Sequence, residues 1–222
     1  MPRSSAFRQL LWQQGPLLAL ILVISATFLF QLTDVGWTLA QGMLVPAEVM
    51  AAGKDLREGE FDLRPLSTLV SHAFLHGDFG HLGMNMLMLW IFAALAAELI
   101  GQRWMLMVFF FTAICGGLCH TFLNPEETIP MLGASGAVMG FEGLYLGMAV
   151  RWQLPDPHIW PMARPIPPGQ LALLGIMGLI FDLSGFVSGI ENIAYGAHLG
   201  GFIGGLVLGA VIVPKPRLAH SR

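Results

Sequence analysis

The chain has 222 residues, of which 55% are hydrophobic and only 11% are charged. A soluble domain carries roughly 25% charged residues, so a water-soluble globule of this length is excluded. The net charge is −3, and the sequence has no basic patch interleaved with aromatic residues. We therefore exclude a nucleic-acid partner and expect an integral membrane protein.

The N-terminal segment has Arg3 and Arg8 ahead of an apolar run over residues 16–32. That run is long for the apolar region of a signal peptide, and no small-x-small cleavage site follows it. We expect it to be the first membrane helix, retained in the mature protein.

Six apolar runs follow one another along the chain. Each is close to the roughly 20 residues that a helix needs to cross about 30 Å of hydrocarbon, and none alternates as the strands of a membrane barrel do. The sequence therefore predicts an all-α, polytopic membrane bundle of six transmembrane helices, forming a single domain over residues 1–222. The predicted spans are residues 16–32, 81–100, 104–122, 135–150, 171–187 and 194–213.

The basic residues divide unevenly between the two sides of this predicted bundle. Cytoplasmic loops carry the excess of Lys and Arg, so an eight-to-three division places both termini in the cytoplasm. The three form one group, Lys54, Arg57 and Arg64, and the eight are Arg3, Arg8, Arg103, Arg151, Arg164, Lys215, Arg217 and Arg222.

The connection between the first two spans, residues 34–80, is longer than ordinary loops, which indicates structure or function of its own. It mixes large apolar residues with charged ones. This mixture predicts short helices that lie in the membrane interface.

Two cysteines, Cys115 and Cys119, are four residues apart in the third predicted span, next to His120. A metal site there is conceivable, but small apolar packing residues are the favoured interpretation. Two cysteines make no disulfide framework. We expect no metal and no cofactor.

Three motifs bring catalytic types of side chain into apolar runs, where ionisable residues are costly and mark function. They are HLGMN at residues 81–85, GASG at 133–136 and AHLGG at 197–201. Ser135 precedes Arg151 by 16 residues, His198 precedes Lys215 by 17, and Asn85 precedes Ile100 by 15. At 1.5 Å per residue, all three lie about 24 Å from the cytoplasmic ends of their helices.

Matched depth predicts a hydrolytic site a few ångströms below the outer boundary of the hydrocarbon. His81 lies one turn above Asn85 on the same helix face. Ser135 begins a predicted helix, whose free N–H groups attract negative charge. Gly133 and Gly136 permit a tight turn into that helix. Gly201 and Gly205 form a small-residue face that lets the sixth span approach the fourth.

The three motifs, in this order, resemble the signature motifs of rhomboid proteases. The FLH at residues 74–76 and Glu98 also fit, and the resemblance covers about residues 71–213. It implies an intramembrane serine endopeptidase in which Ser135 is the nucleophile and His198 its general base, a dyad without a third acid. Asn85, His81 and the backbone around Gly133 are implied as stabilisers of the oxyanion.

The resemblance also implies single-span membrane proteins as substrates, cut near the extracytoplasmic face of a cell membrane, whether bacterial inner membrane or plasma membrane. His76 is expected to stabilise the long loop, and Arg64 receives no role. Rhomboids often have an aromatic residue four positions after the serine, where this chain has Met139. Glu142 matches no expected feature.

Two other functions remain open at this stage. A rhomboid-like protein can bind membrane clients without cutting them, although such relatives usually lack the serine or the histidine that this chain retains. A transporter could use His81, Glu142 and His198 as an ion path. The chain has no internal repeat, and its polar cluster lies near one face, so both features favour the protease.

Overall fold

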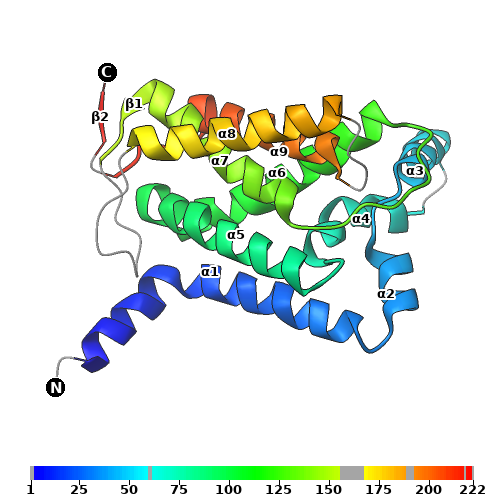
Figure 1. Ribbon diagram of the computed structural model, residues 1–222, viewed down its shortest axis with the longest axis horizontal. Helices are drawn as coiled ribbons and strands as arrows, with labels where there is room; N and C mark the ends of the chain where they lie inside the picture. Colours follow the sequence, from blue (N-terminus) through cyan, green and yellow to red (C-terminus); the bar gives the residue numbers. More distant parts are fainter. Residues whose placement is uncertain (1–2, 60–61, 156–167, 189–192, 218, 222) are drawn as a thin grey trace.

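The computed structural model describes residues 3–59, 62–155, 168–188, 193–217 and 219–221, and over these ranges the fold is all-α apart from one pair of very short strands (Figure 1). The elements are α1 (Arg3–Gln31), α2 (Val35–Gly42), α3 (Pro46–Glu58), α4 (Arg64–Ser71), a 3-10 turn η1 (His72–Phe74), α5 (Phe79–Ile100), α6 (Gln102–Leu123), α7 (Ser135–Arg151), β1 (Trp152–Gln153), α8 (Pro168–Val187), α9 (Tyr195–Val207), a π-helical turn η2 (Leu208–Ile212) and β2 (His220–Ser221).

Helix α7 is the centre of the bundle. Most of its residues from Gly136 to Met148 are buried, against α5, α6 and α9. Glycines make this packing close: a side chain at Gly140 would collide with Thr112 of α6, and one at Gly143 would collide with the Phe202 carbonyl of α9. Small residues at helix contacts let backbones approach, which is how helices associate in lipid.

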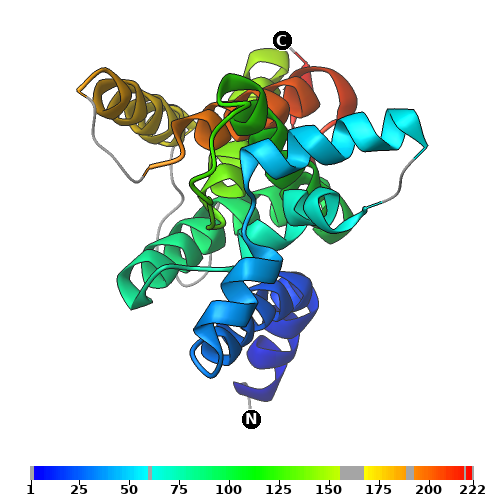
Figure 2. The ribbon, with the colours of Figure 1, turned by 90° about the vertical axis from the view of Figure 1, so that its right-hand side faces the viewer.

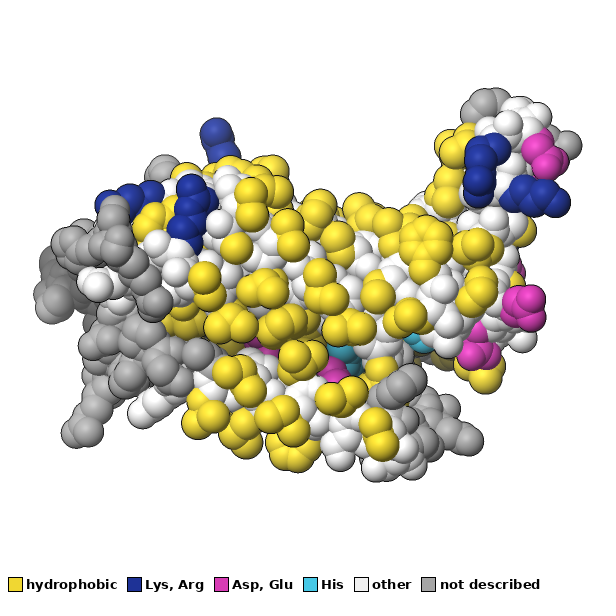
Figure 3. Space-filling model, turned by 90° about the horizontal axis from the view of Figure 1, so that it is seen from above, with side chains coloured by type: hydrophobic (Ala, Val, Ile, Leu, Met, Phe, Trp, Pro, Cys, Tyr) yellow, Lys and Arg dark blue, Asp and Glu magenta, His cyan; other side chains and the backbone are white. Residues whose placement is uncertain are grey.

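Within the described residues, four helices are long and apolar enough to cross a membrane, over residues Gln14–Gln31, Phe79–Ile100, Gln102–Leu123 and Tyr195–Ile212. The apolar part of α8, Leu173–Gly185, is shorter. Helix α7 has 17 residues, five fewer than α5 and α6 with 22 each, so it is shorter by about 7.5 Å. Hydrophobic side chains cover the middle of the molecule, and Lys and Arg gather towards its two ends (Figure 3).

The two ends of the chain lie at the same end of the bundle (Figure 1). The strands β1 and β2 pair there in antiparallel register, with Trp152 opposite Ser221. This pairing joins the end of α7 to the C-terminal segment, and the sequence analysis did not predict it.

The long connection forms the short helices that its composition predicted. Helices α2, α3 and α4 lie at the end of the bundle opposite the termini, and α3 protrudes from it on the side away from α8 (Figure 2). Arg64 of α4 joins α3 through an ion pair of 2.7 Å with Glu48. Both side chains are substantially exposed, so this pair contributes at most about 1 kcal/mol.

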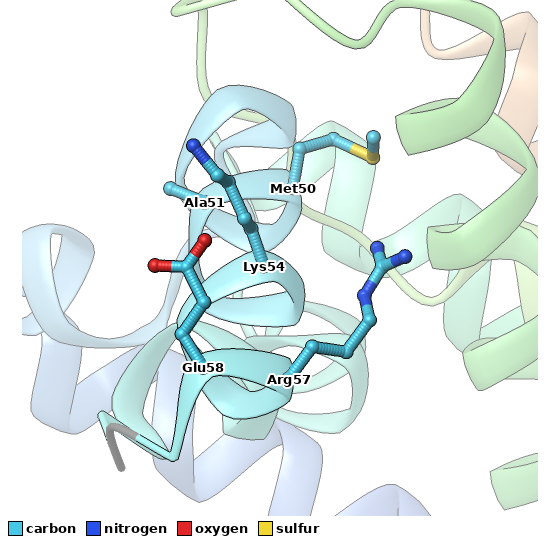
Figure 4. A pocket seen from close by; sticks show the side chains of 5 residues that line it. All are labelled: Met50, Ala51, Lys54, Arg57 and Glu58. Atoms are coloured by element: carbon cyan, nitrogen blue, oxygen red, sulfur yellow. The ribbon is translucent and has the colours of Figure 1, made fainter.

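A shallow hollow of about 510 Å³ lies on α3 (Figure 4). Its lining residues are Met50, Ala51, Lys54, Arg57 and Glu58, and none belongs to the three motifs. This hollow therefore has no part in the site described below.

Candidate active site

Ser135 is the first residue of α7, as predicted, and a tightly held loop leads into it. Gly133 has φ of +123°, a conformation that residues with a side chain rarely adopt. Its N–H donates to the His72 carbonyl at 2.9 Å. Upstream, the backbones of Leu44 and Met131 exchange two hydrogen bonds of 2.8 and 3.0 Å. The long connection therefore fixes the segment that presents Ser135.

His198 lies on α9, and its Nε2 is 2.8 Å from Ser135 Oγ. The approach of α9 to α7 depends on the two glycines that the sequence analysis selected. A side chain at Gly201 would overlap the Gly136 carbonyl, and one at Gly205 would overlap the Gly140 carbonyl. Both glycines therefore lie where α9 packs against α7, and this close packing brings the serine and the imidazole within hydrogen-bond distance.

Asp182 of α8 lies on the other side of the imidazole, with its Oδ2 2.7 Å from His198 Nδ1. The resemblance implied a dyad without a third acid, and sequence reasoning missed this carboxylate. The available signal was a single charged residue in the run from Pro168 to Val187, since an ionisable residue in a membrane span suggests function by default.

The Ser135–His198–Asp182 cluster is partly shielded from the surroundings. The side chains of His198 and Asp182 are 15% and 19% exposed. In Figure 3, acidic and histidine side chains come to the surface along the seam where α8 lies against the rest of the molecule. A small reactant can therefore reach this cluster while most of each side chain stays covered.

His81 of α5 lies close to Ser135, and both side chains lie next to Gly133. A Cβ built on Gly133 would lie 2.8 Å from His81 Nε2 and 3.8 Å from Ser135 Oγ, so both groups lie beside Gly133 and leave little room for a side chain there. The Gly77 N–H donates to His81 Nδ1 at 3.4 Å. In a neutral ring with an accepting Nδ1, the Nε2 carries the hydrogen, so His81 presents a donor beside Gly133.

Asn85 is buried, and its Nδ2 donates to the His81 carbonyl at 3.0 Å. This bond uses one of the two hydrogens on its amide nitrogen. The described contacts tie Asn85 to the helix turn that carries His81 and give it no bond to Ser135 or His198. Its role as an oxyanion donor therefore stays a prediction.

The two histidines just before α5, His72 and His76, are buried. Burial lowers the pKa of His72 to about 4, although its Nδ1–H donates to the Thr68 carbonyl at 2.7 Å. Burial and the neighbouring His81 lower the pKa of His76 to about 4. The His76 backbone exchanges hydrogen bonds with the Gln31 side chain at 2.7 and 3.3 Å. His76 thus anchors the start of α5 to the end of α1.

Met139 and Glu142 of α7 both face α8. A Cβ built on Gly178 would lie 3.8 Å from Met139 Sδ and 3.2 Å from Glu142 Oε2. The Glu142 Oε2 atom is buried without a hydrogen-bond partner among the described residues. Glu142 therefore lies at the α7–α8 contact, and the structure gives it no bond to His198.

Cys115 and Cys119 lie at the contact of α6 with α9, where side chains at Gly200 and Gly204 would collide with them. Both cysteines therefore pack between these two helices, which is the interpretation that the sequence analysis favoured. Among the described residues, no group of three His, Cys, Asp or Glu side chains is arranged to hold a metal ion.

Comparisons with known proteins connect this chain to one family. A family model described as the Rhomboid domain matches residues 64–215. Rhomboid protein 1, mitochondrial, of Saccharomyces cerevisiae is 30% identical over 146 residues, which are 64% of this chain and 40% of the yeast protein. RHOMBOID-like protein 12, mitochondrial, of Arabidopsis thaliana is 30% identical over 152 residues, 61% of this chain and 43% of that protein.

A Bacillus subtilis relative, YdcA, is 29% identical over 148 residues, which cover 66% of this chain and 67% of YdcA. The chain thus spans less than half the length of the yeast and plant relatives, and about two thirds of the bacterial one. All of the motifs that carry the site lie inside the matched range.

Proposed function

This chain belongs to the rhomboid family, and on that premise we propose that it is an intramembrane serine endopeptidase. The observation that carries the proposal is the 2.8 Å contact between Ser135 Oγ and His198 Nε2. A serine hydroxyl is a weak nucleophile until an adjacent base takes its proton. The contact joins a nucleophile and a base that lie on two helices, α7 and α9, which pack closely at their glycines. The apolar surface of the protein is suited to lipid.

The chemistry follows from these positions. His198 takes the proton of Ser135 as the serine oxygen attacks the carbonyl carbon of the scissile peptide. It then gives that proton to the leaving amine, and water hydrolyses the acyl-enzyme by the same route. The first N–H groups of α7 have no partner within the helix, so they are placed to bind the oxyanion. His81 Nε2–H and the second amide hydrogen of Asn85 are further donors from α5.

Membrane proteins are the substrate class that the family implies, and we propose single-span segments cut near their extracytoplasmic ends. The short length of α7 supports a nucleophile a few ångströms inside the bundle, at the end opposite the chain termini. Six spans with both termini in the cytoplasm fit the common position of the two ends and the division of the basic residues.

A membrane helix resists this enzyme because its carbonyl groups are hydrogen-bonded internally. The segment must unwind locally before Ser135 can attack. Glycine and proline weaken a helix by about 1 and 3 kcal/mol per residue. We therefore expect cleavage after a small residue, with helix-weakening residues just downstream.

The test is incubation of the purified protein with a panel of single-span substrates in detergent and in liposomes. We compare wild type with Ser135→Ala and with Ser184→Ala, which removes an exposed hydroxyl from α8. The proposal expects cleavage by wild type and Ser184→Ala and none by Ser135→Ala. Equal cleavage by Ser135→Ala refutes it, and binding of substrates without cleavage by wild type identifies a client-binding protein instead.

A second experiment addresses the substrate. Replacing the Gly and Pro residues beside the mapped cut by Leu should slow cleavage in membranes. Undiminished cleavage of that substrate, or a cut at its cytoplasmic end, contradicts the proposed route of access.

A further inference from the structure

We infer that Asp182 is a positioning residue of this site, whose carboxylate fixes the tautomer and orientation of His198 so that its Nε2 accepts the proton of Ser135. The inference rests on the proposed protease function and adds to it. The site then consists of three hydrogen-bonded groups: the Asp182 carboxylate on α8, the His198 imidazole on α9 and the Ser135 hydroxyl on α7.

The geometry decides which nitrogen carries the hydrogen. An ionised carboxylate only accepts hydrogen bonds, so the 2.7 Å contact of Asp182 Oδ2 with His198 Nδ1 selects the Nδ1–H tautomer. The Nε2 of that tautomer has a free lone pair, and it lies 2.8 Å from Ser135 Oγ. The hydroxyl therefore donates to Nε2. When His198 takes the proton, the carboxylate stabilises the imidazolium that forms.

The sequence of α8 places the Asp182 carboxylate on the helix face that lies against the bundle. Gly175, Gly178, Asp182 and Gly185 recur at spacings of three and four residues, so they share one helix face. That face lies against the bundle: Gly175 and Gly178 adjoin Glu142, and a side chain at Gly185 would collide with the Tyr195 hydroxyl. The other faces are exposed and apolar, at Leu173, Leu174, Ile176, Met177, Ile180, Phe181, Leu183 and Val187.

The free-energy cost of placing a carboxylate in α8 argues that Asp182 has a function. Asp182 is the single charged residue between Pro168 and Val187, and a carboxylate in a membrane helix is costly wherever it lies. Packing alone would be served by another glycine or alanine on the same face. A carboxylate with one described partner, the imidazole that contacts Ser135, is what a serine nucleophile and its base require.

Other titratable groups surround His198. Glu142 lies on α7, His81 on α5 and His120 on α6; both histidines interact electrostatically with His198. Within the described residues, Asp182 is the one acidic group with a hydrogen bond to His198. A pH effect that is specific to Asp182 must therefore be separated from the general field of these neighbours.

The experiment measures kcat and KM against pH for wild type, Asp182→Asn and Asp182→Ala on one single-span substrate. Asparagine is nearly isosteric, but its amide can donate as well as accept, so it no longer selects the tautomer. We expect Asp182→Asn to lower kcat by about 10²–10⁴-fold with KM nearly unchanged. The acid limb of kcat/KM should move to lower pH, because the imidazolium loses its negative neighbour.

Matched variants separate this role from a structural one. Ser184→Ala, on the exposed side of α8, should leave kcat and the acid limb unchanged. Glu142→Gln removes a nearby carboxylate that does not contact His198, and it should move the acid limb less than Asp182→Asn. An equal or larger shift in Glu142→Gln overturns the inference, as does an Asp182→Asn enzyme with wild-type kcat.

A measurement on the unaltered protein covers the case in which the Asp182 variants fail to fold. Nitrogen-15 NMR of labelled histidines, with His198 assigned through His198→Gln, should find the Nδ1–H tautomer of His198 at neutral pH; the Nε2–H tautomer overturns the inference. The proposed function fails separately, when wild type does not cleave or Ser135→Ala does. Cleavage that needs Ser135 but does not depend on Asp182 supports the protease function and refutes only the positioning role of Asp182.

Discussion

Replacing Gly201 by Ala should separate α9 from α7 and so disconnect His198 from Ser135. The added Cβ would overlap the Gly136 carbonyl oxygen and lie 2.7 Å from its carbon. An ordinary contact needs about 3.5–4.0 Å, so the helices must move apart by about 1 Å. His198 lies three residues before Gly201 and Ser135 one residue before Gly136, so the same movement lengthens the 2.8 Å contact to about 4 Å, beyond hydrogen-bond distance.

A displacement of about 1 Å at a catalytic contact costs roughly 10²-fold in rate, and overpacking a helix contact costs about 1–3 kcal/mol of stability. We expect Gly201→Ala to lower kcat at least by that factor, and to lower the thermal unfolding midpoint in detergent. Gly83→Ala is the matched control, because a Cβ on this α5 glycine would meet nothing within 4 Å. It should keep its activity. Wild-type kcat in Gly201→Ala would show that close packing of α9 on α7 does not position the site.

The remaining predictions concern the groups around the nucleophile. His72 and His76 have pKa values lowered to about 4 from the ordinary 6.5, so the unfolded chain takes up protons first as the pH falls below 6.5. Each histidine should therefore cost about 2 kcal/mol of stability at pH 5 relative to pH 7; thermal unfolding at both pH values measures the loss, and a His76→Gln protein that loses as much as wild type would contradict it. Gly133→Ala forces a positive φ on alanine, at about 1–2 kcal/mol, and pushes a methyl group towards His81, so it should lose most activity in the cleavage assay; retained activity would mean that the site does not need glycine at position 133. Asn85→Ala should lower kcat by about 10²–10³-fold with little change in KM, whereas a change in KM alone would assign Asn85 to binding or packing.

Much of the site was predictable because its parts are local in sequence. Ser135 and its preceding glycine form one short turn, and Gly201 and Gly205 lie on the helix of His198, so spacing and residue type were sufficient. The depth argument placed Ser135 and His198 at one level, where the structure brings them into contact. The short helices of residues 34–80 followed from their mixed composition.

The parts that were missed depend on how separate elements dock. Asp182 reaches His198 only because α8 turns its glycine face towards the bundle, and a periodicity of small residues is a weak signal in an already apolar run. The burial of His72 follows from the packing of the long connection against α6, where Gly117 adjoins the His72 ring. Pairing of β1 with β2 joins Trp152 to Ser221, 69 residues further along the chain, and no local pattern predicts it.

The most direct test of the central claim is to locate the adduct of a serine-directed fluorophosphonate on the purified protein by mass spectrometry. An activated serine reacts, whereas an ordinary hydroxyl does not. We predict a single adduct on the peptide that contains Ser135 in wild type, unchanged in Ser184→Ala and absent from His198→Ala. An adduct on another residue, or undiminished labelling of Ser135 without His198, would contradict the claim that His198 makes Ser135 a nucleophile.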